Sequence, residues 1–360
     1  MLTTSIISAV IVLGILVFVH ELGHFILAKI LGIGVVTFSL GFGPKLLGKK
    51  VGETQYQVAA VPLGGYVKLI GENPGEEVKE VDRLRSFSAA PIWKRAMIIG
   101  AGPFFNFFLA VALFSGINLF GIPHLPAKIG ELSPGFPAEK AGLKKGDDVL
   151  AIDGEKVSRW DDLSRTIRAS KGKDLILQVR RDGETLQVKI TPKSSKTKNL
   201  FGEEVQIFMI GIQPSDEVIL EKVNPIVAIS MGFTQTGGAI KLTIVSIWKL
   251  IGRVIPAKTI GGPILIAQLA GEQAKRGLLS LALFMAILSI NLGVINLFPV
   301  PILDGGHFLF LALEAILRRP ISIKMMEIAQ QIGLILIIFL MIFAFYNDIL
   351  RLVSPGGSEF

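Results

Sequence analysis

The sequence predicts an α-helical polytopic membrane protein with four transmembrane helices, a membrane-associated β-hairpin and an inserted α+β domain. The 360 residues are 51% hydrophobic and 18% charged, whereas soluble domains carry about 25% charged residues. Four apolar runs approach or exceed the roughly 20 residues that a helix needs to cross the hydrocarbon core. Between them lie alternating segments punctuated by Gly and Asp, a pattern typical of strands and turns.

The four apolar runs are the predicted spans. They cover about 4–30, 96–121, 278–298 and 328–350. The first lacks the basic start of a signal peptide and its apolar run is too long for one, so we interpret it as a retained helix. The third ends at a Pro-Val-Pro break, 299–301, after which apolar sequence continues to Leu317.

The predicted spans divide the chain into domains. We assign 1–121 to the first two helices with a β-hairpin at about 54–70, 122–195 to the inserted domain, 196–277 to a linker and a membrane-surface helix, and 278–354 to the last two helices. The hairpin is expected to turn at Pro62-Leu63-Gly64-Gly65. The final residues, 355–360, are typical of a cloning scar.

The segment 224–255 is apolar but carries a basic stripe. Lys241, Lys249 and Arg253 are spaced by eight and four residues, which places them on one face of a helix. This pattern is typical of an amphipathic helix lying along a membrane surface. A fifth span is the alternative that the sequence leaves open.

Charge predicts the orientation, because basic residues accumulate in short cytoplasmic loops. Segments 31–95 and 318–327 are basic, and no basic side chain precedes Lys29. We therefore expect both loops in the cytoplasm, both termini outside and the inserted domain on the outer side. A basic stripe interleaved with aromatic residues is missing from the sequence, so we expect no nucleic-acid partner.

The first apolar run contains His20-Glu21-Leu22-Gly23-His24. Ionisable groups at membrane depth cost about 2.5–3.5 kcal/mol each for Asp, Lys or Arg, and they usually mark function. On a helix, positions i and i+4 share a face, so His20 and His24 can bind one metal with Glu21 beside them to act on a metal-bound water. The alternative is a cluster of polar side chains that is buried and hydrogen-bonded in a helical bundle.

A zinc site needs a third protein ligand and one open position. The chain has no cysteine, so the ligand must be His or a carboxylate. Asp304 is the acid in the apolar stretch from Leu278 to Leu313, and it follows prolines that break the helix. Asn296, before the break, can donate to and accept from the backbone of a substrate strand. A loop turn capped by Asp-Gly is the alternative.

These motifs together resemble those of the site-2 protease family of intramembrane zinc metalloproteases. The matching motifs are His20-Glu-Leu-Gly-His24, the GPxxN pattern of Gly102, Pro103 and Asn106, and the NxxPxPxLDG pattern from Asn296 to Gly305. Residues 130–154 resemble part of a PDZ domain, and a PDZ domain between the second and third spans is similar to the bacterial regulator of sigma-E protease (RseP) branch. Well-known members of that branch carry tandem PDZ domains, whereas this sequence contains one recognisable copy.

The resemblance implies a function and a set of site residues. One Zn²⁺ would be held by His20, His24 and Asp304, with Glu21 as general base for cleavage of transmembrane segments of single-span proteins, such as an anti-sigma factor or signal-peptide remnants. The implied location is the bacterial inner membrane, with the zinc toward its cytoplasmic side. The residues implied at the edges of the site are Asn296, Asn291, Gly64, Gly65 and Tyr66 for substrate, and Gly102 and Asn106 for support of the ligands. For Gly102 and Asn106, helix packing is the alternative that the sequence leaves open.

The PDZ-like domain has two alternative roles. It could bind a peptide end near Lys128-Ile129-Gly130, or it could exclude substrates with bulky outer domains, and the resemblance favours exclusion. For the whole chain, a catalytically inactive membrane PDZ adaptor and a metal transporter are the competing functions. His307 is expected to be a polar residue near the cytoplasmic interface, and Glu314 is expected to be structural.

Overall fold

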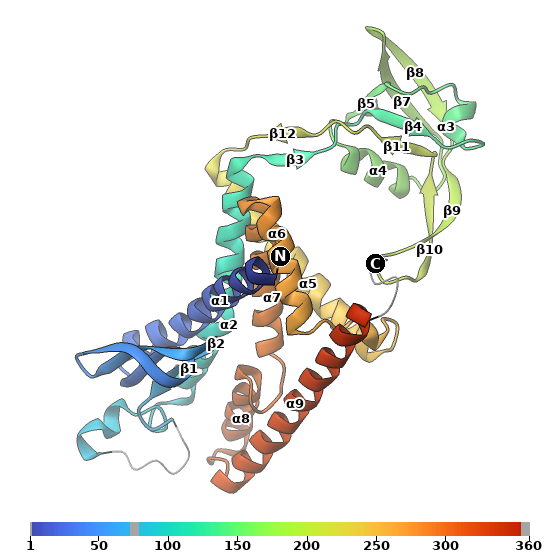
Figure 1. The fold of residues 1–360 in the computed structure, drawn as a ribbon. Coiled ribbons are helices and arrows are strands. Elements are labelled where there is room, and N and C mark those ends of the chain that lie inside the picture. The colour runs from blue at the N-terminus through green and yellow to red at the C-terminus, as the bar shows by residue number, and fades with distance from the viewer. Residues whose placement is uncertain (1, 73–78, 354–360) are drawn as a thin grey trace. The chain divides into compact units, whose positions relative to one another are not determined.

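The computed structural model describes residues 2–72 and 79–353; the predicted cloning scar at 355–360 lies outside the described residues. The chain forms two compact units (Figure 1). The first comprises residues 1–117, 228–250 and 256–360, and the second comprises 118–227 with 251–255. Each unit is described by itself.

Helices dominate the first unit. They are α1 (Leu2–Ile30), α2 (Ile92–Phe120), α5 (Pro225–Ile251), α6 (Pro263–Arg276), α7 (Leu278–Asn296), α8 (Asp304–Leu317) and α9 (Ile323–Val353), with short 3-10 helices η1 (Glu80–Arg85) and η2 (Ala257–Thr259). Within the described residues, α1, α2, α7 and α9 are long and apolar enough to cross a membrane. The prediction of four apolar spanning helices is therefore confirmed by length and composition.

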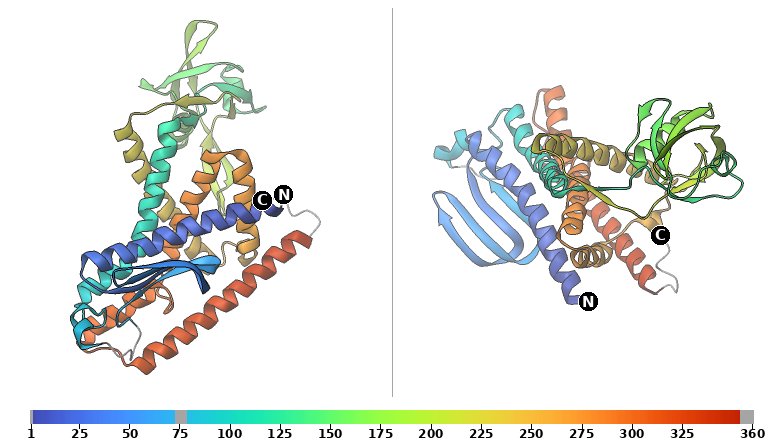
Figure 2. Two further views of the ribbon diagram at one scale, coloured as in Figure 1. Left: turned by 60° about the vertical axis from the view of Figure 1, so that its left-hand side comes forward. Right: turned by 90° about the horizontal axis from the view of Figure 1, so that it is seen from above.

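A two-stranded sheet lies alongside α1 (Figure 2). It consists of β1 (Val35–Val51) and β2 (Thr54–Leu69). The tight turn joins Val51 to Thr54, which face each other, and Leu40 faces both Val58 and Gly65. The predicted hairpin at 54–70 with its turn at 62–65 is therefore wrong. Residues 62–65 instead carry β2 from one edge of β1 to the other, and the hairpin begins at residue 35.

Helix α5 packs against two of the apolar helices. Ala239 and Ile240 contact a buried cluster formed by Ala110, Phe114, Ala286, Ile290 and Val294. Gly232 allows this close approach, because a Cβ there would lie 2.3 Å from Ser115 Oγ. The predicted surface helix thus covers one side of α2 and α7, and its alignment with a membrane surface stays a prediction.

The end of α9 caps the start of α6. Asp348 is buried, and its carboxylate accepts hydrogen bonds from the backbone N–H groups of Gly262, Ile264 and Leu265. These N–H groups have no partner within their own helix, and a negative charge is favourable at a helix N-terminus. The carboxylate therefore fastens α6 to α9.

The second unit is rich in β-structure. Its elements are β3 (Ile122–His124), β4 (Ile129–Leu132), α3 (Pro137–Lys140), β5 (Asp148–Ile152), β6 (Glu155–Lys156), α4 (Trp160–Ala169), β7 (Leu175–Arg181), β8 (Glu184–Ile190), β9 (Lys193–Lys198), β10 (Glu204–Met209), β11 (Ile212–Pro214) and β12 (Ile219–Glu221). A four-stranded sheet runs in the order β6-β5-β7-β8. Leu163 and Ile167 of α4 join Leu177 and Val179 in its core.

The second unit extends beyond the predicted boundary at residue 195. Ile210 is 1% exposed and belongs to the core of this unit, and β11 pairs with β4. The predicted linker from 196 onward therefore begins too early, because its alternation was too short to be distinguished from an irregular connection. The β-rich inserted domain is confirmed, and its identity as a PDZ domain stays a prediction.

Candidate metal centre

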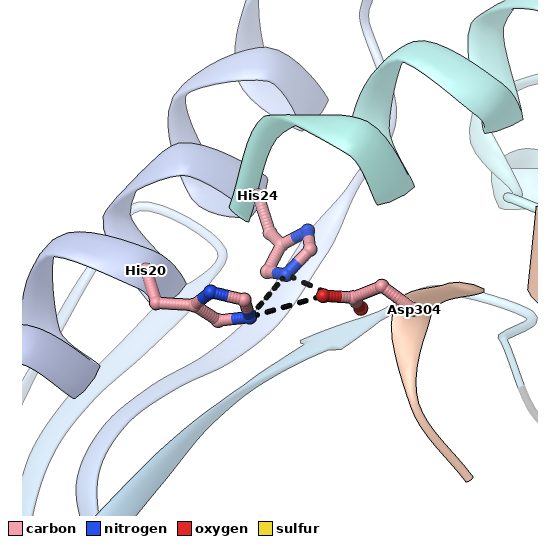
Figure 3. A group of neighbouring side chains, drawn as sticks. All are labelled: His20, His24 and Asp304. Atoms are coloured by element: carbon pink, nitrogen blue, oxygen red, sulfur yellow. Dashed lines mark hydrogen bonds and ion pairs between the residues drawn. The ribbon is translucent and has the colours of Figure 1, made fainter. Parts of the chain in front are cut away.

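One face of α1 presents two imidazoles at the same point. His20 and His24 are one helical turn apart, and their Nε2 atoms lie 3.2 Å from each other. Figure 3 shows both rings reaching from the same helix toward the carboxylate of Asp304. His20 Nε2 is 3.1 Å from Asp304 Oδ2, and His24 Nε2 is 3.6 Å from Asp304 Oδ1. The structure therefore brings the two histidines together with Asp304, which lies 280 residues after His24 in the sequence.

A break between two helices delivers Asp304. α7 ends at Asn296 and α8 begins at Asp304, because the prolines at 299 and 301 cannot continue the helix. The connection folds tightly over the start of α8. A Cβ on Gly305 would lie 2.2 Å from the Phe298 oxygen, and one on Gly306 would lie 2.3 Å from the Val300 oxygen. Two glycines are required for Asp304 to begin its helix at this point.

The three side chains fit a zinc ion. Ligands about 2.0–2.2 Å from a tetrahedral Zn²⁺ lie about 3.3–3.5 Å from one another, close to the separations of 3.1, 3.2 and 3.6 Å. Asp304 Oδ2 is also buried without a hydrogen-bond partner among the described residues. Because a buried carboxylate oxygen is normally paired, this atom favours a bound cation. Two histidines and one carboxylate also form a ligand set known for catalytic zinc.

A backbone carbonyl fixes the tautomer of His24. His24 Nδ1 lies 2.8 Å from the oxygen of Ile98 in α2. A carbonyl only accepts, so Nδ1 must donate, and Nε2 of the neutral ring keeps its lone pair for a metal.

Asn106 of α2 lies beside Nδ1 of His20, as the Ile98 oxygen lies beside Nδ1 of His24. Its Nδ2 lies 3.1 Å from His20 Nδ1, while its Oδ1 is buried without a hydrogen-bond partner among the described residues. The oxygen and nitrogen of an amide are exchangeable assignments. In the opposite assignment Oδ1 accepts from His20 Nδ1–H, which leaves His20 Nε2 free to ligate. Ser289 of α7 donates to the Asn106 backbone oxygen at 2.7 Å and ties this part of α2 to α7.

Gly102 gives the imidazoles their space. A Cβ at this position would lie 2.2 Å from His24 Nε2 and 2.7 Å from His20 Cε1. Gly23 plays the same part on α1, since a Cβ there would lie 2.4 Å from the Ala101 oxygen. α1 and α2 can therefore approach each other closely only with glycine at both positions.

Glu21 and the ligands line one cavity. Its volume is about 810 Å³, and its wall includes Glu21, Tyr66, Asn296 and His307. The carboxylate of Glu21 contacts the backbone of Val67 in β2. A Cβ on Gly65 would lie 3.3 Å from Glu21 Cγ and 2.7 Å from the Ser39 oxygen. Gly65 thus allows β2 to pass beside the glutamate.

The other predicted substrate residues divide into two groups. Asn296 Nδ2 lies 3.3 Å from His20 Nε2, and Tyr66 stacks on Phe42 in the cavity wall. Gly64 has a φ of 150° and sits against the Phe42 ring. Asn291 is not among the residues that line the cavity, and its Oδ1 accepts from Thr243 of α5 at 2.8 Å. The structure therefore places Asn291 in a helix contact and leaves its predicted contact with substrate without support.

Sequence reasoning missed three features of the site. The Ile98 carbonyl carries no sequence signal, because every residue has one. Ser289 is an ordinary small residue in an apolar helix. Arg95 and Glu314 form an ion pair in the cavity wall, and a single acid ten residues after Asp304 was the signal that could have pointed to it.

Apolar helices that hold two histidines, a carboxylate and a neighbouring glutamate around one cavity define a membrane-associated metallohydrolase. The chain belongs to peptidase family M50, whose family model matches residues 8–340. It is 36% identical to a "putative zinc metalloprotease" of Agrobacterium fabrum, over 98% of this chain and 97% of the relative. Similar proteins with the same description occur in Campylobacter jejuni (36% identical, over 96% of this chain and 94% of the relative) and Clostridium perfringens (34%, over 96% and 98%). The resemblance to site-2 proteases is therefore confirmed at family level, which supports zinc-dependent proteolysis.

Proposed function

We propose that this protein is an intramembrane endopeptidase that uses one Zn²⁺ to cleave transmembrane segments of single-span membrane proteins. The observation that carries the proposal is the convergence of His20, His24 and Asp304, from two apolar parts of the chain, beside Glu21. A metalloprotease needs this ligand set and an adjacent base. Family membership supports the same chemistry.

The residues divide the chemical work. When bound, zinc supplies a Lewis acid that polarises the scissile carbonyl and lowers the pKa of a water. Glu21 takes the proton from the attacking water and later delivers it to the leaving amine. The Ile98 oxygen and Asn106 keep His24 and His20 in the orientation that presents Nε2. The breakdown of the peptide bond therefore needs no further acid or base from the chain.

The substrate must be extended before it can be cut. Peptide groups of a membrane helix are locked in internal hydrogen bonds, so the segment has to unwind at the scissile bond. The end of β2 from Gly65 to Leu69 lies beside Glu21 and contributes Tyr66, Val67 and Leu69 to the cavity. It is the edge that we expect to pair with the extended segment by strand addition. Asn296 lines the same cavity, and the proposal assigns it to hold the backbone of that segment.

The Asn296 assignment has its own test. Asn296→Ala should slow cleavage while zinc stays bound, because Asn296 is proposed to contact substrate and not the metal. Unchanged turnover would reject the clamp.

The proposed setting is the bacterial inner membrane. The basic residues in 31–95 and 318–327 support a cytoplasmic position for these loops. The proposal then has both termini and the second unit outside. His20 and His24 lie late in α1 (Leu2–Ile30), which runs inward in the proposed orientation. The metal site is therefore proposed to lie toward the cytoplasmic side.

The decisive experiment compares the wild-type protein with Glu21→Gln, reconstituted with a single-span substrate. The substitution keeps the shape of the side chain and removes its basicity, so we expect zinc to be retained and cleavage to be lost. An inactive adaptor predicts that wild type does not cleave, and a transporter predicts zinc flux without cleavage. Full cleavage by Glu21→Gln would overturn the proposed mechanism.

The second unit is proposed to exclude substrates that still carry a bulky outer domain, with capture of a peptide end as the alternative. Its two ends lie side by side, because His124 of β3 faces Ile219 of β12. Residues 125–218 can therefore be replaced by a short turn without separating the flanking strands. Exclusion predicts that this deletion allows cleavage of full-length substrates that are normally spared, whereas peptide capture predicts loss of cleavage.

A further inference from the structure

An ion pair joins α8, which begins at Asp304, to α2, which supports the two histidines of α1. Arg95 of α2 and Glu314 of α8 form two parallel hydrogen bonds, with Nη1–Oε2 at 2.9 Å and Nη2–Oε1 at 2.6 Å. The side chains are only 13% and 20% exposed. Arg95 Nε also donates to the Ala90 oxygen at 3.0 Å, so the plane of the guanidinium is fixed by the backbone before α2.

Each partner stands on an element that positions a ligand. Arg95 precedes Ile98, the acceptor for His24, by one helical turn. Glu314 lies on the 14-residue helix that begins at Asp304. Gly305 and Gly306 allow the first turn of this helix to pack against the preceding loop. Between the two ends of the helix, Phe308 packs on Gly100 of α2. The ion pair is therefore the polar contact that holds the far end of α8 on α2.

We propose that Arg95 and Glu314 are positioning residues that set the rotation and register of α8 on α2, and thereby place Asp304 opposite the two histidines. A two-bond contact between planar groups fixes direction as well as distance, which an apolar contact does not. The carboxylate of Asp304 must meet two nitrogens at once, so a small rotation of α8 would remove one of its contacts. This inference rests on the proposed metal site.

Zinc affinity of the purified full-length protein tests the inference. Arg95→Glu and Glu314→Arg each place like charges together, and each should weaken zinc binding by about 10–100-fold, as loss of supporting contacts does at metal sites. The double variant Arg95→Glu/Glu314→Arg restores opposite charges and should recover most of the loss, a coupling that independent sites would not give. Visible absorption of bound Co²⁺ should change in the single variants and return in the double variant.

Two further variants keep the test decisive. Arg95→Lys keeps the charge and loses the planar contact, so it should fold normally and bind zinc several-fold more weakly even if the charge reversals fail to fold. Arg180→Glu breaks the exposed pair between Arg180 and Asp148 in the second unit and should leave zinc affinity unchanged.

Unchanged zinc affinity and Co²⁺ spectrum in Arg95→Lys and the reversals would overturn the inference, as would a folded double variant that binds no better than the single ones. His24→Ala separates this failure from that of the proposed function. If His24→Ala also keeps wild-type zinc affinity, the metal site itself is wrong. If it loses zinc while Arg95→Lys does not, only the positioning role is wrong.

Discussion

Asp304 in the first unit and Asp147 in the second both have a carboxylate oxygen buried from solvent, yet the surroundings of the two residues differ. Asp147 is 1% exposed, and it accepts two hydrogen bonds from Arg181 and one from the Lys144 backbone. Asp304 Oδ2 is buried without a hydrogen-bond partner among the described residues. The carboxylate faces two imidazole nitrogens, with Oδ2 toward His20 and Oδ1 toward His24. Burial alone therefore does not mark a functional carboxylate. The unsatisfied buried oxygen does, because it requires a partner that the chain does not provide.

The same contrast holds for charged residues at large. In the second unit, pairs such as Lys189–Asp174 and Lys196–Glu204 have side chains that are about half or more exposed. Exposed pairs of this kind contribute little to stability, because solvent screens the two charges. In the first unit, His20, His24 and Asn106 of α1 and α2 gather at one point of a largely apolar bundle. A polar residue in the apolar helices of the first unit therefore indicates a functional site, whereas a polar residue on the surface of the second unit indicates almost nothing about function.

Removing one metal ligand should have the largest effect. His24→Ala is expected to reduce zinc content to background and to abolish cleavage, because two remaining ligands hold zinc poorly. Zinc per chain is measured on the purified protein. His124→Ala is the matched control, since this histidine lies in the second unit and should leave zinc and cleavage unchanged. Zinc retained by His24→Ala would show that the unsatisfied Asp304 oxygen has another explanation.

Two glycines of α2 offer a sharper test. Gly102→Ala places a Cβ 2.2 Å from His24 Nε2, so the imidazole must move, and we expect cleavage to fall by about 100-fold or more because small misplacements at a reacting centre have such effects. Gly116→Ala is the control on the same helix, where a Cβ would meet nothing within 4 Å among the described residues. Equal activity of the two variants would contradict the close packing at Gly102.

The site was more predictable than the sheet beside it. His20, Glu21, His24 and Asp304 could be chosen from sequence because ionisable residues stand out in apolar runs. The hairpin turn could not be placed, since Pro62-Leu63-Gly64-Gly65 has a stronger turn composition than the actual turn at Gly52-Glu53. Nothing local indicates that β2 changes from one edge of β1 to the other. The contact of Asn291 with Thr243 could not be predicted for a similar reason, because spacing along α7 does not reveal that α5 covers that face.

Asn106 should give an intermediate effect. Asn106→Ala removes the side chain that orients His20, and we expect zinc affinity to fall by about 10–100-fold, the range for lost orienting contacts. Asn106→Asp keeps an acceptor for His20 Nδ1–H and should bind zinc more tightly than Asn106→Ala. Competition with a chelator measures both affinities. A stronger loss in the Asp variant would mean that the amide nitrogen, not the oxygen, faces His20.

Asp147 should give the smallest functional effect and a clear effect on stability. Burial works to raise the pKa of Asp147, but the hydrogen bonds from Arg181 and the Lys144 backbone outweigh it and hold this pKa below its ordinary value of 3.8. A carboxylate whose pKa is lower in the folded state stabilises that state above the unfolded pKa, and this contribution disappears as pH falls through the folded pKa. The second unit should therefore lose stability below about pH 4.

Asp147→Asn tests this contribution directly. At pH 6 it should lower the free energy of unfolding of the second unit by about 1–3 kcal/mol, the range for weakening hydrogen bonds to a charged group. Hydrogen exchange of the β5 and β7 amides in the full-length protein measures the change, and the difference from wild type should shrink as pH approaches 3. Asp174→Asn, in an exposed pair, should change exchange much less.

In Asp147→Asn, zinc content and cleavage of a segment already trimmed on its outer side should stay at wild-type levels. If Asp147→Asn also reduced zinc, the satisfied carboxylate would be tied to the metal site, and the distinction between the two aspartates would fail.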